Sequence, residues 1–160
     1  MPGARRFAAA LALAALAALA TPPGRAAQPR PRQVLAWADV RNGYQHESIT
    51  HALATIERLG HESGLWETTI RTDSQPITKR PIQFKTGTGI ATGEQFLARN
   101  LTWYDAIFFF GVREIDLDAG QRAALLSFVR DDGKGFVATH AGATAFFSWP
   151  EFGAMLGGRF

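Results

Sequence analysis

From residue 33 onward, short apolar runs alternate with amphipathic segments, a pattern typical of strands that alternate with helices. The apolar runs predict four strands, at residues 33–40, 65–71, 105–111 and 135–140. The segments between and after them predict four helices, at residues 48–59, 94–100, 118–133 and 150–156. This alternation favours an α/β protein with a mostly parallel sheet and right-handed crossovers.

Local signals define several of these elements. Apolar residues recur at helical spacing on one face of 48–59, and Gly60 is expected to end that helix in the left-handed conformation. Asp118, with Gln121 at the third helical position, forms a variant of the capping box. Residues 73–93 are rich in Pro, Thr and Gly, which predicts a long loop with room for a hairpin.

The strand at 105–111 is apolar on both of its faces. Such a strand belongs in the middle of a sheet that helices cover on both sides. In sheets of this kind, the working site lies at the carboxyl ends of the strands. We therefore expect the loops that follow the strands to converge on one crevice.

The N-terminal residues 1–27 differ from the rest of the chain and are typical of a secretory signal peptide. A basic start at residues 5–6 precedes an unbroken apolar run at 7–20, and residues 21–24 (Thr-Pro-Pro-Gly) break any helix. The run is shorter than the roughly 20 residues that cross a bilayer, although an uncleaved membrane anchor remains an alternative. Residues 28–32 form a linker.

Cleavage after Ala20 or Ala26 would deliver the protein to the periplasm or the medium, with no stable membrane insertion. The whole chain has 17 Lys and Arg against 14 Asp and Glu. Residues 1–26 contain three arginines and no acid, so 17 − 3 leaves 14 basic residues against 14 acidic ones. A formally neutral domain has no basic stripe for phosphates, which excludes a nucleic-acid partner. The chain has 0 Cys, which excludes disulfides and cysteine nucleophiles.

Two histidines are the strongest candidates for chemistry. His140 ends a buried strand among small residues, where an abrupt turn would push its side chain out of the sheet edge. A histidine bonded to loop backbone is the alternative. His46 lies at the entry of the first helix, where it could bind a ligand or cap the helix. Glu47 is either exposed or a general base. His46 and His140, together with an acid, could bind a divalent metal ion.

The sequence at these positions resembles ThuA-like domains, which are named for a trehalose-utilisation protein. They belong to the class I glutamine amidotransferase-like superfamily. The resemblance covers residues 33–160. The matching stretches are Gly43–Ile49, Tyr104–Phe109, Gly135–Gly142, Trp149–Gly153 and Leu156–Phe160.

The resemblance implies a flavodoxin-like sheet and a role in carbohydrate metabolism, on a keto sugar, a disaccharide or a glycoside. It assigns His140 and His46 as the catalytic or metal-binding pair. Tyr44, Glu47 and Trp149 would contact the sugar. Amidotransferases carry a cysteine nucleophile where this chain has His140, so glutamine hydrolysis by that route is excluded.

Two departures from the family pattern keep other functions open. Thr144 stands where the family usually has an acid a few residues after the histidine. ThuA-like domains also continue beyond the segment that ends at Phe160, so the resemblance implies an incomplete sheet. A non-catalytic carbohydrate-binding module and an inactive gene fragment are therefore alternatives to an enzyme. The sequence does not determine the oligomeric state.

Overall fold

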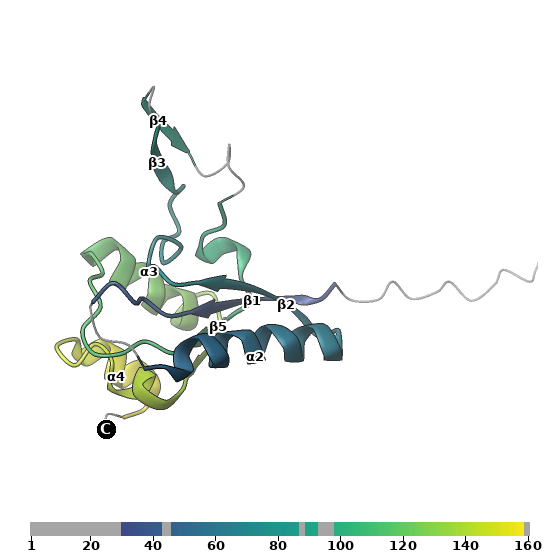
Figure 1. The fold of residues 1–160 in the computed structure, drawn as a ribbon. Coiled ribbons are helices and arrows are strands. Elements are labelled where there is room, and N and C mark those ends of the chain that lie inside the picture. Colours follow the sequence, from purple (N-terminus) through teal and green to yellow (C-terminus); the bar gives the residue numbers. More distant parts are fainter. Residues whose placement is uncertain (1–29, 43–45, 87–88, 93–97, 159–160) are drawn as a thin grey trace, which may run out of the picture. The chain divides into compact units, whose positions relative to one another are not determined.

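The central feature of the computed structural model is a four-stranded parallel sheet with the strand order β2–β1–β5–β6 (Figure 1). The structure describes residues 30–42, 46–86, 89–92 and 98–158. The strands of the sheet are β1 (Arg32–Trp37), β2 (Trp66–Arg71), β5 (Ala106–Phe109) and β6 (Gly135–Ala138). All four predicted strands are therefore confirmed, and the strand that is apolar on both faces lies inside the sheet, between β1 and β6.

Two long helices connect neighbouring strands on opposite faces of this sheet. Helix α2 (Ser48–Ser63) joins β1 to β2, and α3 (Ala119–Arg130) joins β5 to β6. The connection from β1 leads outward to β2, and the connection from β5 leads outward in the opposite direction to β6. Right-handed crossovers in opposite directions must place their helices on opposite faces, as Figure 1 shows for α2 and α3. The predicted α/β fold of the flavodoxin type is thus confirmed.

Each face of the sheet buries its own apolar cluster. The larger cluster combines the sheet with α3 and with α4 (Pro150–Leu156), and its fully buried residues include Phe109, Leu125, Phe128 and Phe152. The smaller cluster lies under α2 and contains Ile49, Leu53, Phe110 and Val112. The sheet therefore separates two cores, and both of them reach the carboxyl ends of the strands.

Helix α2 is longer than predicted, because Gly60 does not end it. The helix continues to Ser63, and the left-handed residue is Gly64, with a φ of 67°. Gly60 is buried against β2, where a Cβ atom would lie 2.5 Å from Nε1 of Trp66. The glycine is thus required for close packing of the helix on the strand, not for termination.

The long loop after β2 contains the hairpin that its composition allowed. Strands β3 (Gln83–Thr86) and β4 (Gly89–Thr92) pair in antiparallel fashion as a separate two-stranded sheet. The predicted helix at 94–100 falls mostly outside the described residues, and its described part, 98–100, is not helical. A short 3₁₀ helix, η2 (Leu101–Trp103), follows instead, capped by the side chain of Asn100.

The predicted signal peptide, residues 1–27, lies outside the described residues. Among the residues that the structure does describe, no helix combines the length and apolar character that a membrane span requires.

The capping box at the start of α3 is confirmed. The Asp118 carboxylate accepts a hydrogen bond from the Gln121 amide at 2.8 Å, and the Gln121 side chain accepts one from the Asp118 amide at 3.1 Å. Gln121 also donates to the Ser74 carbonyl at 2.7 Å. The cap therefore ties the start of α3 to the loop after β2.

Replacement of this cap gives a direct test of its contribution. Asp118→Ala leaves amides of the first turn unpaired, so the free energy of unfolding should fall by about 1 kcal/mol. Asp118→Asn preserves an acceptor at the same position and should retain most of the stability. Chemical denaturation of the three proteins measures the difference, and an equal loss in both variants would contradict the capping role.

Candidate functional site

The two predicted histidines lie together at the carboxyl ends of the strands. His46 precedes α2, and His140 follows β6. Their ring centroids are 4.9 Å apart, and the rings meet edge to face at 86°. Phe110, at the end of β5, contacts both of them, with centroid distances of 5.5 Å to His140 and 6.3 Å to His46. Three loops thus contribute to one cluster of rings.

The backbone at His140 has an unusual conformation. Its φ is 48°, in the left-handed region that few non-glycine residues occupy. His140 begins the 3₁₀ helix η3 (His140–Thr144), which also contains the small residues Ala141 and Gly142. A Cβ atom on Gly142 would lie 2.9 Å from the Phe109 carbonyl oxygen. This turn therefore fits closely on the end of β5 while the His140 side chain stays exposed.

A cavity of about 380 Å³ lies beside the two imidazoles, and we call it the histidine cavity. Its lining consists of His46, His140, Ala141 and Thr144. The Thr144 hydroxyl donates to the Ala141 carbonyl at 2.9 Å, which uses its proton within the turn. The small side chains leave space next to the imidazoles, and the two rings are the groups in this lining that can take up or release a proton.

Two other predicted site residues, Glu47 and Trp149, are not among the residues that line this cavity. Tyr44 lies outside the described residues. Glu47 is exposed at the start of α2, and its side chain makes no capping hydrogen bond. Trp149 is only 4% exposed and packs on Phe146 and Phe152 in the larger core cluster. The Trp149 ring is thus part of the core, and its predicted contact with a sugar stays a prediction.

The two histidines supply two nitrogen ligands for a metal ion. Within the described ranges, no group of three or more His, Cys, Asp or Glu side chains is arranged to hold a metal. A structural zinc site uses four protein ligands, and a catalytic one uses three. The described residues offer fewer than either, so they do not by themselves complete a metal site.

A second and larger cavity lies at the same edge of the sheet. It has a volume of about 590 Å³, and we call it the polar cavity. Its lining comes from the loops after β1 and β5, from α3 and from the segment before α4. The residues are Asp39, Arg41, Asn42, Glu114, Ile115, Asp116, Arg122 and Ser148. Sequence reasoning predicted that the loops after the strands converge, but it missed Asp39, which it placed inside the strand at 33–40.

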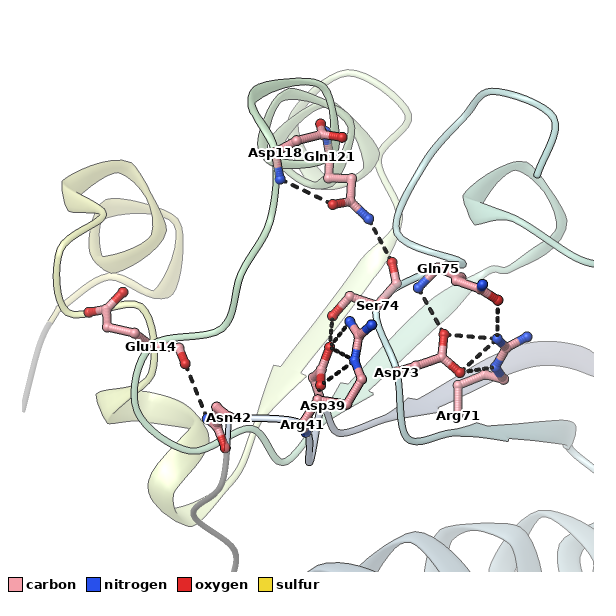
Figure 2. A network of polar contacts seen from close by, with 10 residues as sticks. All are labelled: Asp39, Arg41, Asn42, Arg71, Asp73, Ser74, Gln75, Glu114, Asp118 and Gln121. Atoms are coloured by element: carbon pink, nitrogen blue, oxygen red, sulfur yellow. Dashed lines mark hydrogen bonds and ion pairs between the residues drawn. The ribbon is translucent and has the colours of Figure 1, made fainter. Parts of the chain in front are cut away.

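Asp39 is the buried centre of a network that Figure 2 shows. Its carboxylate accepts hydrogen bonds from Nε and Nη2 of Arg41, at 3.1 and 2.6 Å, and from the Ser74 hydroxyl at 2.6 Å. Burial raises the pKa of Asp39, but the hydrogen bonds from Arg41 and Ser74 outweigh burial and hold the pKa below its ordinary value of 3.8. The carboxylate is therefore charged and fixed in place.

Further hydrogen bonds hold Asn42, Glu114 and Ser148 in the lining of the polar cavity. The Asn42 amide donates to the carbonyl oxygens of Val112 and Glu114, the latter at 3.1 Å (Figure 2). The Glu114 carboxylate accepts from the Ser148 amide at 2.7 Å and from its hydroxyl at 2.9 Å. These bonds connect the loops after β1 and β5 with the segment before α4.

The lowered pKa of Asp39 predicts a pH dependence of stability. A carboxylate whose pKa is depressed in the folded state stabilises that state above its unfolded pKa, and this contribution is lost as pH falls through the folded value. Asp39→Asn should therefore lower the free energy of unfolding by about 1–3 kcal/mol near neutral pH. The difference from the unmodified protein should shrink below pH 3.8. Denaturant titrations over a pH series measure it.

Glu62→Gln, on the exposed face of α2, serves as the matched control. Its free energy of unfolding should differ only slightly from that of the unmodified protein at every pH, because the exposed ion pair of Glu62 contributes little to stability. A gap between Asp39→Asn and the unmodified protein that stays constant with pH would contradict the assignment of the charged carboxylate.

Comparisons with known proteins agree with this architecture. A sequence model of the ThuA family, described as trehalose utilisation, matches residues 33–160. The crystal structure of a ThuA-like protein from Bacteroides uniformis ATCC 8492 superposes with a TM-score of 0.52 at 20% sequence identity. The superposition covers 86% of this chain and 47% of that one, so this chain spans about half the length of the solved relative. No curated protein gives a significant match.

At 20% identity, the solved structure supports the fold alone. The family match is independent of it and takes in the stretches that carry both histidines and the loop after β5. From residue 33 to residue 160, this chain belongs to the ThuA family of trehalose-utilisation domains.

Proposed function

We propose that the chain binds and converts a carbohydrate at the pair formed by His46 and His140. The family supports a general association with carbohydrate metabolism. The substrate class that we propose is a keto sugar, a disaccharide or a glycoside. The observation that carries the proposal is the 4.9 Å separation of the two rings, which come from loops far apart in the sequence.

Imidazoles suit this role because they exchange protons near neutral pH, and carbohydrate conversions require protons to move to and from oxygen or carbon. The left-handed backbone at His140 adds support, because strained non-glycine residues persist where surrounding structure holds them and cluster at functional sites. In the proposed reaction, His140 exchanges a proton with the substrate. His46, in edge contact with it, positions the His140 ring or completes the proton transfer.

A non-catalytic carbohydrate-binding module is the second candidate. One observation favours it. Among the described residues, no carboxylate lines the histidine cavity, and Glu47 lies exposed at the start of α2. Such a module would bind the same sugars without turnover.

Substitution at His140 distinguishes the candidates. Asn is the preferred replacement, because it tolerates a positive φ and so preserves the turn. His140→Asn should reduce turnover by about a hundredfold or more, the usual contribution of a general acid or base. A panel of keto sugars, disaccharides and glycosides, followed by product analysis, provides the measurement.

His51→Asn is the control. His51 is an exposed histidine on α2, so its replacement should leave turnover unchanged. Undiminished turnover in His140→Asn would contradict the proposed role of the pair. Sugar binding by the unmodified protein without any product would favour the binding module.

We also propose that residues 1–27 direct export. The basic start, the apolar run at 7–20 and the break at 21–24 support this proposal. In a Gram-negative host, the protein should appear in the periplasm with a new N-terminus between residues 21 and 28, as measured by mass spectrometry of the intact protein.

Leu13→Arg interrupts the apolar run and should hold the full-length chain in the cytosol. An intact Met1 on cytosolic protein without this substitution would contradict export.

A further inference from the structure

The polar cavity lies where a sheet of this kind places its ligands. Most of its lining residues lie in the loops after β1 and β5. From these two neighbouring strands, the connections to the next strands run in opposite directions. Open α/β sheets bind ligands in the crevice outside the carboxyl ends of the strands at this switch point. Its volume of about 590 Å³ is within the usual range for small-molecule pockets.

The cavity is pre-organised by hydrogen bonds and packing. Asp39 is held by Arg41 and Ser74, and Glu114 is held by Ser148. Arg122 donates from Nε to the Leu117 carbonyl at 3.2 Å, and its Cζ lies 5.4 Å from the centroid of the Trp149 ring. Trp149, although absent from the histidine cavity, therefore supports an arginine that lines the polar one.

The chemistry of the lining selects a class of ligand. Three carboxylates, of Asp39, Glu114 and Asp116, face two guanidinium groups, of Arg41 and Arg122. The formal charge of −1 disfavours an anion such as phosphate. A cation is disfavoured because Asp39 is already paired with Arg41 at 2.6 Å.

The lining places hydrogen-bond acceptors, the carboxylates, beside hydrogen-bond donors, the guanidinium groups. This arrangement suits a ligand with hydroxyl groups, because a hydroxyl both donates and accepts hydrogen bonds. Asp116 is exposed, its charge acts on Arg41 across the cavity, and no hydrogen bond of its carboxylate is found within the described part of the chain. It is the acceptor available to a ligand, and the terminal nitrogens of Arg122 are the donors. A neutral polyhydroxylated molecule is the best match to both.

The same loops that line the polar cavity also carry the histidine pair. Asn42 precedes His46 on the loop after β1, and Ser148 follows Thr144 on the segment after β6. Phe110, which contacts both imidazoles, leads into Glu114. The two cavities are therefore lined by residues that are close to one another along the chain.

We propose that the polar cavity is the recognition subsite for a neutral sugar unit, which Asp116 and Arg122 bind through its hydroxyl groups. This inference rests on the proposed function, because it assigns the sugar unit to the substrate that the histidine pair acts on. Asp116 and Arg122 are specificity residues in this assignment, and they take no part in proton transfer.

Calorimetric titration of the full chain with methyl α-D-glucopyranoside tests the subsite. Inorganic phosphate and L-arginine serve as the charged comparators. The neutral glycoside should bind, and the two charged ligands should not. Asp116→Asn and Arg122→Gln should each weaken the glycoside by about tenfold, because each removes a hydrogen bond to a charged group. Glu62→Gln and Arg58→Gln, which remove an exposed ion pair on α2, should leave it unchanged.

Thermal unfolding of each variant establishes that the fold is retained. Because Asp116 is exposed, Asp116→Asn should unfold at the same temperature as the unmodified protein. No glycoside binding, unchanged affinity in both cavity variants, or preferential binding of phosphate or arginine would each overturn the subsite.

His140→Asn separates this inference from the proposed function. It should reduce turnover by about a hundredfold or more, and it should weaken glycoside binding less than either cavity variant does. If turnover depends on His140 but the cavity variants bind normally, the subsite fails and the function stands. If the cavity variants lose affinity while His140→Asn remains fully active, the function fails and the subsite stands.

Discussion

Burial of the phenylalanine run at the end of β5 is the constraint on which the rest of the structure depends. Side chains alternate across a strand, so Phe109 faces one core and its neighbours Phe108 and Phe110 face the other. Phe109 is fully buried, with its ring centroid 4.5 Å from that of Trp37 and 5.9 Å from that of Phe152. A strand that is apolar on both faces cannot lie at an exposed edge. It must have β1 on one side and β6 on the other, with helices above and below.

The same constraint brings the histidines together. Hydrogen bonds continue past the strand ends on both sides of β5, from the Phe110 amide to the Trp37 carbonyl at 3.0 Å and from the Thr139 amide to the Phe109 carbonyl at 3.0 Å. The chain that leaves β1 carries His46, and the chain that leaves β6 carries His140. Because β5 lies between those two strands, the Phe110 ring at its end meets both imidazoles. The pair is thus a consequence of strand order as well as of local sequence.

The pattern of apolar residues was sufficient to predict the strands, the opposed helices and the position of His140, because each depends on short-range periodicity. It was insufficient wherever a distant partner decides the outcome. Gly60 has the appearance of a helix terminator, and only the approach of Trp66 explains its place inside α2. Trp149 before a proline reads equally well as exposed or buried, and its packing on Phe146 and Phe152 decides between them. The Asp39 carboxylate accepts a hydrogen bond from Ser74, which lies 35 positions away in the sequence, and no local motif predicts such a contact.

Backbone strain is distributed unevenly between the two edges of the sheet. At the edge where the strands begin, positive φ values fall on glycines, Gly64 before β2 and Gly133 before β6. At the edge where the strands end, the described residues with positive φ are Arg113, His140 and Phe146, and the Phe146 amide donates to the Arg113 carbonyl at 3.0 Å. A non-glycine residue in this region costs of order 1–3 kcal/mol, which glycine would avoid. Turn formation alone therefore does not explain the side chains at these three positions: Phe146 packs in the core, and His140 lines the histidine cavity.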